Sequence, residues 1–154
     1  MFRVTQTKSG MKYFKDVKQQ VYLLDTNICI YILRGMYGMN ERVKSVGGMD
    51  NCYISEITVA ELKCGKIYGE LKGGPKYKDQ KLDEFFASIK VLPISSVIDL
   101  FAEEKAKFKS SGTPVSDFDL LIGCTAVFNN MTLVTQNVRD FKSIKNISIE
   151  NWIE

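Results

Sequence analysis

Short apolar runs alternate with longer amphipathic stretches along this chain, and the alternation predicts strands and helices in turn. The short runs at 21–24 and 52–55 are largely apolar, which is typical of strands buried on both faces of a sheet. The longer stretches repeat apolar residues every three or four positions, the period of an amphipathic helix. We predict strands at 21–24, 52–55, 91–94, 132–134 and 147–149, and helices at 27–33, 39–46, 57–71, 77–89, 96–109, 116–128 and 138–141.

Alternating strands and helices predict an α/β fold class, with a mainly parallel central sheet covered by helices on both faces. Two helix starts have local signals: Asn27 is a candidate N-cap, and Ser116 with Asp119 has the pattern of a capping box. In the helix at 57–71, an apolar stripe predicts a buried face made of Ile57, Ala60, Leu62, Cys64, Ile67 and Leu71. Residues 1–20 lie outside the alternation, so we assign an N-terminal extension at 1–20 and one domain at 21–154.

Composition supports a single globular domain. The chain has 154 residues, of which 45% are hydrophobic and 25% charged, and a chain of this length can bury a sizeable core. No apolar run approaches the roughly 20 residues of a membrane span, and the N-terminus has no apolar segment of the kind found in secretory signals. The four cysteines form no C-x-x-C pair and each has apolar neighbours, so we expect buried thiols and a reduced, cytoplasmic location without membrane contact.

The charge is unevenly distributed along the chain. Residues 1–20 carry five basic residues against Asp16, a net charge of +4, and the rest carries 16 basic and 17 acidic residues, a net charge of −1. We interpret the basic segment as a solvated arm. The chain has no histidine, which excludes the usual Ser-His-Asp and Cys-His catalysis and makes a zinc site improbable. Any catalysis must therefore use carboxylates, Lys, Tyr, Cys or an oxygen-bound metal.

Four acidic residues follow the predicted strands at positions that bring them to one edge of the sheet. Asp25 directly follows the first strand, Glu61 lies early in the helix after the second, Asp119 begins a helix, and Asp140 follows the strand at 132–134. Ligands of parallel α/β sheets bind at the carboxyl ends of the strands. Clustered carboxylates repel one another unless a cation neutralises them, and oxygen-only ligands suit Mg²⁺ or Mn²⁺. We therefore predict a metal site.

The polar neighbours of these acids are candidates for orienting them. Thr26 and Asn27 follow Asp25 directly, and Thr135 and Asn137 follow the strand at 132–134. Taken one at a time, each acid also fits a simpler role as a helix cap or a solvated helix residue, and T-x-N after a strand is common turn chemistry. The metal hypothesis rests on their joint placement.

The sequence resembles the PIN-domain nucleases and, more narrowly, the VapC toxins of bacterial toxin–antitoxin pairs. The resemblance is carried in order by LLDTNICIYIL at 23–33, ISEITVAEL at 54–62, GTPVSDFDLLIG at 112–123 and LVTQNVRDF at 133–141, with IENW at 149–152. It extends from about residue 21 to the C-terminus and implies a three-layer α/β/α fold, cleavage of RNA that depends on Mg²⁺ or Mn²⁺, a VapB-like antitoxin as partner and a homodimer.

The resemblance also implies roles for individual residues. The catalytic and metal-binding acids are Asp25, Glu61, Asp119 and Asp140, and the polar residues around them are Thr26, Asn27, Asp117, Thr135 and Asn137. Asp119 matches the family pattern better than its neighbour Asp117. Attack by a metal-activated water yields a 5′-phosphate and a 3′-hydroxyl. The antitoxin tail that crosses such an acidic groove is expected to carry a cation.

RNA also needs basic contacts, and the segment after Glu61 is rich in lysines interleaved with tyrosines. We predict RNA contacts from Lys63, Lys66, Lys72 and Lys76, although a solvated surface explains each lysine equally well. Two other functions remain open. A haloacid-dehalogenase-like hydrolase also begins with a strand-end Asp but reads D-x-D, whereas this chain has Asn27 at the second position, and a non-catalytic PIN-fold binding module would keep the fold alone.

The helix after Asp25 is apolar nearly all round, which predicts a second buried contact besides the sheet. We name Tyr31, Leu33, Met36 and Tyr37 as candidates for a face covered by a second subunit. The alternative is that the neighbouring helix at 39–46 covers this face within the same chain.

Overall fold

The computed structural model of the chain describes residues 2–7, 10–15, 18–74 and 79–153. A parallel sheet of five strands forms its centre, in the order β5-β4-β3-β6-β7. The strands are β3 (Tyr22–Leu24), β4 (Cys52–Ser55), β5 (Lys90–Leu92), β6 (Thr132–Val134) and β7 (Ser148–Glu150). The predicted α/β class with a mainly parallel sheet is confirmed.

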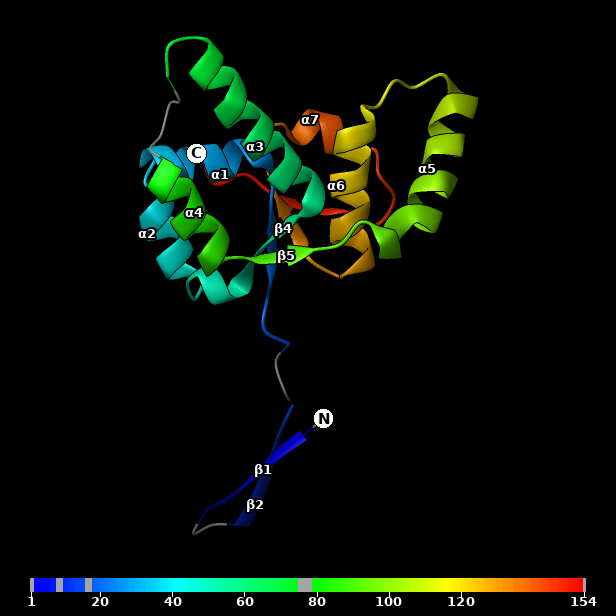
Figure 1. Cartoon of the computed structure of the whole chain (residues 1–154). Coiled ribbons are helices and arrows are strands. Elements are labelled where there is room, and N and C mark those ends of the chain that lie inside the picture. Colours follow the sequence, from blue (N-terminus) through cyan, green and yellow to red (C-terminus); the bar gives the residue numbers. More distant parts are fainter. Residues whose placement is uncertain (1, 8–9, 16–17, 75–78, 154) are drawn as a thin grey trace.

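Helices follow the strands in the predicted order. They are α1 (Thr26–Arg34), α2 (Met39–Ser45), α3 (Glu56–Leu71), α4 (Asp79–Ser88), α5 (Ile98–Ser111), α6 (Asp117–Phe128) and α7 (Val138–Phe141), with single 3₁₀ turns η1 (Met49–Asn51) and η2 (Ser95–Val97). In Figure 1, α1, α2 and α4 lie on one side of the strands and α5, α6 and α7 on the other. The three-layer arrangement is therefore confirmed.

Two hydrophobic cores lie on the two faces of the sheet. Successive side chains of a strand point to opposite faces, so Leu24 packs with α1, α2 and α4 in one core, whereas Leu23 packs with α5, α6 and α7 in the other. Val134 and Leu133 of β6 divide between the two cores in the same way. Because both faces are covered, the central strands are apolar at nearly every position.

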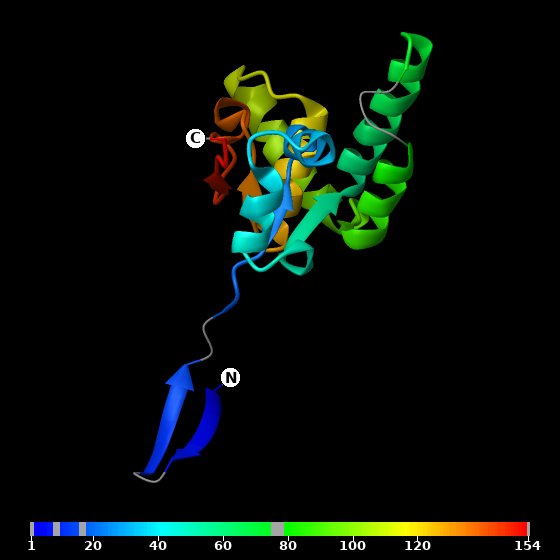
Figure 2. The same cartoon turned by 90° about the vertical axis from the view of Figure 1, so that its left-hand side faces the viewer.

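The second half of α3 departs from its predicted burial. Only Ile57 and Leu62 of the predicted stripe are buried, while Ile67 and Leu71 are 58% and 79% exposed. Figure 2 shows the reason: the end of α3 extends beyond the sheet, with only α4 beside it. Ala60 and Cys64 are also exposed, so the expectation of a buried thiol is wrong for Cys64 and right for the other three cysteines.

The N-terminal segment contains a β-hairpin, for which the sequence analysis predicted no strands. Strand β1 (Phe2–Thr7) pairs antiparallel with β2 (Gly10–Lys15), in a register that joins residue 2 to residue 15 and residue 7 to residue 10. This pair is separate from the five-stranded sheet. None of the helices in the described ranges is long and apolar enough to cross a lipid bilayer.

Candidate active site

Asp25 lies at the end of β3 and begins α1. Its backbone N–H donates to the carbonyl of Val134 at 2.9 Å, which continues the pairing of β3 with β6. Its carboxylate accepts two hydrogen bonds, one from the backbone N–H of Thr26 at 2.8 Å and one from the hydroxyl of Thr135 at 2.7 Å. Asp25 is therefore itself the N-cap of α1, and the prediction that Asn27 caps this helix is wrong. The two bonds fix the direction of a side chain that is only 5% exposed.

Glu61 reaches the same region from α3. The hydroxyl of Thr26 donates to a carboxylate oxygen of Glu61 at 2.7 Å, and the buried hydroxyl of Thr58 lies 3.3 Å from that of Thr26. Thr26 thus contacts one acid through its backbone and another through its side chain. It links the start of α1 to α3 and holds Asp25 and Glu61 in a fixed relation.

The two acids in the first turn of α6, Asp117 and Asp119, have different partners. Asp117 forms an ion pair with Lys105 of α5, whereas the charges of Asp25 and Asp140 help to raise the pKa of Asp119. Ser116 is the N-cap residue, but its side chain makes no capping hydrogen bond, so the predicted capping box with Asp119 is not formed. The first turn of α6 is therefore not held by the predicted interaction between Ser116 and Asp119.

Asp140 is on α7, beyond the loop that follows β6. Thr135 of that loop donates to Asp25 and accepts the backbone N–H of Asn137 at 3.0 Å. Asn137 is the N-cap residue of α7 but makes no capping bond with its side chain, which is exposed. Thr135 therefore connects the loop that presents Asp140 to the carboxylate of Asp25.

The electrostatics show how closely these acids are coupled. Burial is the main cause that raises the pKa of Asp25; the charges of Glu61 and Asp140 raise it further, while the bonds from Thr135 and Thr26 lower it. Burial also raises the pKa of Asp119, followed by the charges of Asp25 and Asp140. Carboxylates that share a site repel each other in their ionised forms. A bound cation would remove this repulsion.

The donors present suit a hard divalent cation, because carboxylate and hydroxyl oxygens are the ligands that Mg²⁺ and Mn²⁺ prefer. In the described part of the chain, however, no group of three or more acidic or cysteine side chains is arranged to hold a metal ion without rearrangement. The side-chain oxygen of Asn27 is buried without a hydrogen-bond partner in the structure. It does not bond to Asp25, which Thr26 and Thr135 orient instead.

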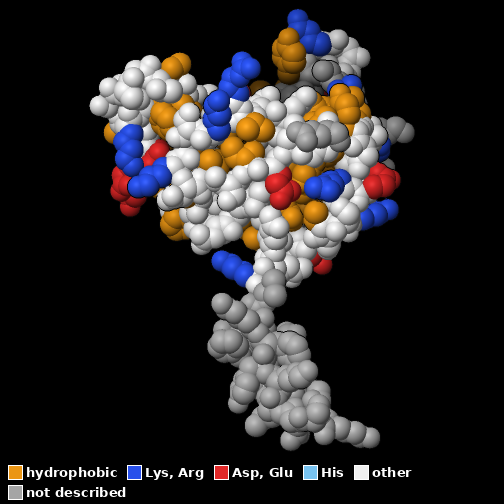
Figure 3. All heavy atoms as spheres, turned by 180° about the vertical axis from the view of Figure 1, so that it is seen from behind, with side chains coloured by type: hydrophobic (Ala, Val, Ile, Leu, Met, Phe, Trp, Pro, Cys, Tyr) orange, Lys and Arg blue, Asp and Glu red, His pale blue; other side chains and the backbone are white. Residues whose placement is uncertain are grey.

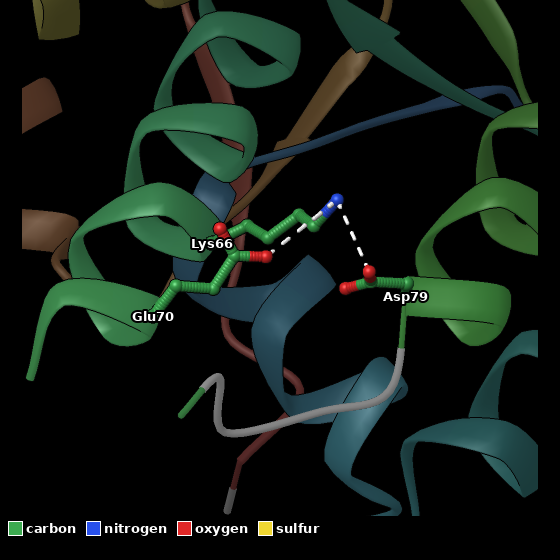
Figure 4. A network of polar contacts seen from close by, with 3 residues as sticks. All are labelled: Lys66, Glu70 and Asp79. Carbon is green, nitrogen blue, oxygen red and sulfur yellow. Dashed lines mark ion pairs between the residues drawn. The ribbon is translucent and has the colours of Figure 1, made fainter. Parts of the chain in front are cut away.

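The predicted RNA-binding lysines are placed differently from one another. Lys66 forms ion pairs with Glu70 at 3.9 Å and with Asp79 of α4 at 3.4 Å, so its charge is already matched within the protein (Figure 4). Lys63 lies over the ring of Phe86, and Lys72 over the ring of Tyr68. Lys76 lies outside the described residues. None of the three described lysines forms an ion pair with Asp25, Glu61, Asp119 or Asp140.

The apolar face of α1 is partly covered within the chain. Leu33 is buried in the core with Met39 and Val43 of α2, so its proposed exposure to a second subunit is wrong. Tyr31 is partly buried and donates its hydroxyl to Gln136, next to Thr135, at 2.6 Å. The ring of Tyr37 packs against that of Tyr31 at 4.8 Å and is 55% exposed.

The sequence reasoning missed three contributors near the acids. Arg139 is exposed on α7 beside Asp140, and it forms no ion pair with any residue the structure describes. Gln136 joins the loop after β6 to α1, and Thr58 is buried beside Thr26. Arg139 was visible in the sequence from its position next to an acid. The other two depend on tertiary contacts.

Comparison with known proteins now identifies the family. The profile of the PIN domain matches residues 22–147. The chain belongs to the PIN-domain family. Its relatives include Ribonuclease VapC2 of Rickettsia felis, which is 33% identical over 135 residues that make up 86% of this chain and 98% of that protein. The tRNA(fMet)-specific endonuclease VapC of Salmonella typhimurium is 29% identical over 133 residues, or 85% of this chain and 97% of that protein.

Solved structures agree with this assignment and place the chain in the VapC group. The VapBC2 complex of Rickettsia felis, bound to a DNA fragment from its promoter, contains a chain with a TM-score of 0.71 and 31% identity, over 86% of this chain and 99% of that chain. A chain of the DNA-bound VapBC complex of Salmonella typhimurium matches with a TM-score of 0.70 and 29% identity, over 86% of this chain and 98% of that chain. Residues before 22 lie outside the family match. Because the chain has the PIN fold, the alternative of a haloacid-dehalogenase-like hydrolase is excluded.

Proposed function

We propose that this protein is a metal-dependent endoribonuclease that acts as the toxin of a VapBC-type toxin–antitoxin pair. One observation carries the proposal: Asp25, fixed by two hydrogen bonds at the end of the central strand, is electrostatically coupled to three other acids that come from three different helices. Acids whose charges raise one another's pKa are costly in a protein that does not use them. The two relatives described above, one named as a ribonuclease and one as an endonuclease, support the same reaction class.

Mg²⁺ or Mn²⁺ is the proposed ion, and when bound it would polarise the scissile phosphate and lower the pKa of a water molecule that attacks phosphorus. Asp25 and Asp119 are the main proposed ligands, with Glu61 and Asp140 completing the set. Thr26 holds Glu61 and Thr135 holds Asp25, so that the carboxylates keep their directions as charge develops. Because water, and not the 2′-hydroxyl of the RNA, would be the nucleophile, the products are expected to be a 5′-phosphate and a 3′-hydroxyl.

RNA must approach a strongly acidic site, which requires positive charge at its margin. Figure 3 shows lysine and arginine side chains scattered singly over the visible described face, and they do not form one broad basic surface there. We assign phosphate binding to Arg139, because it is exposed, precedes Asp140 in α7 and forms no ion pair among the described residues. Lys66 is no longer favoured, since Glu70 and Asp79 already engage it.

A VapB-like antitoxin is the proposed partner, and the cytoplasm the proposed location. The solved relatives are complexes of VapB with VapC, which supports a small protein partner for this chain. A cationic side chain on that partner would neutralise the coupled acids in the absence of metal. Expression of this protein alone is expected to slow growth, and co-expression of a small protein encoded next to it is expected to restore growth. Normal growth with intact RNA during overproduction would contradict the toxin role.

A non-catalytic PIN-fold module is the remaining alternative. The decisive experiment is incubation of the purified protein with total RNA in Mg²⁺, in Mn²⁺ and in EDTA, beside the variant Asp25→Asn. Cleavage that needs metal and is lost in the variant supports the nuclease. Binding of RNA without cleavage under all conditions, with the variant equal to the wild type, would favour the binding module.

A further inference from the structure

Phe118 is an exposed aromatic residue in the same helical turn as two of the acids. It lies between Asp117 and Asp119 at the start of α6 and is 50% exposed. The buried part of α6 begins two residues later at Leu120 and ends at Ala126, so Phe118 is not needed to form the core. Exposed single hydrophobic residues are common on protein surfaces. What distinguishes Phe118 is its position.

Its neighbours define the direction of the ring. Successive helix residues project about 100° apart around the helix axis. Asp117 on one side bonds to Lys105 of α5, and Asp119 on the other side interacts with the charges of Asp25 and Asp140. Phe118 therefore projects from the margin of the acidic site. A base stacked on its ring would therefore lie next to the turn of α6 that carries Asp119.

We propose that Phe118 is a stacking platform for one nucleobase of the RNA substrate, next to the bond that is cut; this inference rests on the proposed ribonuclease function. A flat aromatic ring is the side chain that stacks on unpaired bases in single-stranded nucleic acid. Arg139, on the helix that carries Asp140, supplies a cation for the backbone of the same nucleotides. Base stacking and phosphate contact together hold RNA beside carboxylates that would otherwise repel it.

The surroundings of Phe118 favour a base over a protein partner. In the segment before the ring, Thr113, Ser116 and Asp117 are polar and exposed and Val115 is half-buried, so few exposed apolar residues lie near Phe118 in the sequence. A protein interface is built around a larger apolar patch. The exposed residues Ile67, Tyr68 and Leu71 at the end of α3 are of that second kind.

The chain contains a matched control. Phe128 ends the same helix, is 51% exposed and also lies outside the core. It is about 15 Å from Phe118 along the helix axis at 1.5 Å per residue, at the end away from the acids. The two rings are equally exposed, so removing either one is expected to change the stability of the fold by a similar amount. A difference in RNA affinity between the two variants would therefore reflect contact with RNA.

The test measures binding of a short single-stranded RNA that carries 2-aminopurine, with Ca²⁺ replacing Mg²⁺ to prevent cleavage. Phe118→Ala is expected to weaken binding about 5- to 150-fold, the usual effect of losing one stacked base, and to abolish the quenching of 2-aminopurine. Phe118→Trp is expected to retain both signals, Phe118→Leu to lose the quenching, and Phe128→Ala to behave as the wild type. In cleavage assays Phe118→Ala should raise KM more than it lowers kcat.

Three results would overturn the inference. Wild-type protein that cleaves RNA while Phe118→Ala binds RNA with unchanged affinity would refute stacking but leave the nuclease intact. Equal losses in Phe118→Ala and Phe128→Ala would show a general effect of the substitutions. Loss of affinity for a co-expressed antitoxin, with RNA binding unchanged, would assign the ring to the protein interface. If the wild type neither binds nor cleaves RNA, the proposed function itself fails.

Discussion

The hydroxyl of Thr26 on α1 donates to the carboxylate of Glu61 on α3 at 2.7 Å, while the backbone N–H of the same threonine donates to Asp25 at 2.8 Å. One residue thus fixes two acids that are separated by 36 positions in the chain. The backbone bond survives any substitution of Thr26 except proline, but the side-chain bond requires a hydroxyl. The two contacts can therefore be separated by mutation.

Thr26→Val is expected to lower kcat roughly 10- to 100-fold, because a hydrogen bond to a charged group is worth about 1.5–3 kcal/mol. Valine keeps the shape of threonine and the backbone bond to Asp25, so the fold should be retained. Thr26→Ser keeps the hydroxyl and is expected to retain most activity. Steady-state cleavage of RNA measures both variants. Equal activity in Thr26→Val and the wild type would show that Glu61 needs no support from Thr26.

The two acids of the first turn of α6 are expected to differ sharply. Asp119→Asn should lower cleavage about 100-fold or more, since it removes a proposed metal ligand. Asp117→Asn breaks only the surface ion pair with Lys105, which is worth at most about 1 kcal/mol, so its activity should stay near that of the wild type. RNA cleavage at saturating Mg²⁺ measures the difference. A larger loss in Asp117→Asn would reverse the two assignments.

The sheet and the position of Asp25 at its edge could be predicted from the sequence because both follow from local pattern. The strands at 52–55 and 132–134 are continuously apolar or nearly so, and they form as predicted. Asp25 lies at the carboxyl end of its strand because parallel topology gives every strand the same direction. Both inferences need only the order of strands and helices.

Features that depend on tertiary contacts could not be predicted. An apolar stripe does not reveal whether another element will cover it, and at Ile67 and Leu71 none of the described elements buries it. The capping pattern of Ser116 with Asp119 is a local preference that the structure does not realise. The lysine-rich segment indicated positive charge, but only the structure shows that Lys66 is paired with acids of α3 and α4.

Arg139 and Lys66 make a second matched pair for RNA binding. The logarithm of the binding constant falls linearly with the logarithm of the salt concentration, and the slope depends on the number of phosphate contacts. Arg139→Gln is expected to make this slope shallower by about one unit, because one phosphate contact is lost. Lys66→Gln should leave the slope unchanged, because its charge is matched by Glu70 and Asp79. Anisotropy titrations of single-stranded RNA over a range of salt concentrations measure both slopes. The opposite ranking would restore the lysine segment as the binding surface.

Self-association is expected through the exposed end of α1, where Tyr37 has a positive φ of 55° and packs on Tyr31. Light scattering should give about twice the 17.5 kDa of one chain. Tyr37→Asn removes the ring while keeping a residue that tolerates this backbone, and it should yield monomers. Leu71→Asn on α3 is the comparison. Dissociation by Leu71→Asn alone would place the interface on α3.

Removal of metal is expected to expose the repulsion between the acids as a loss of stability. Burial, with the charges of Asp25 and Asp140, raises the pKa of Asp119 in the folded protein. The folded protein then binds more protons than the unfolded chain, so stability falls as the pH rises from about 4, where an unfolded Asp titrates, through the raised pKa. In EDTA at neutral pH, Asp119→Asn should therefore melt about 1–3 °C above the wild type.

The same variant separates a functional acid from a structural one. Below about pH 4 the carboxyl is protonated in both states, so the difference in Tm between wild type and Asp119→Asn should disappear. Mg²⁺ should raise the Tm of the wild type and have a smaller effect on the variant, because ligand binding stabilises only a protein that retains its site. Thermal unfolding across pH, with and without Mg²⁺, measures all three. A variant less stable than the wild type in EDTA at neutral pH would show that Asp119 supports the fold and not a cation.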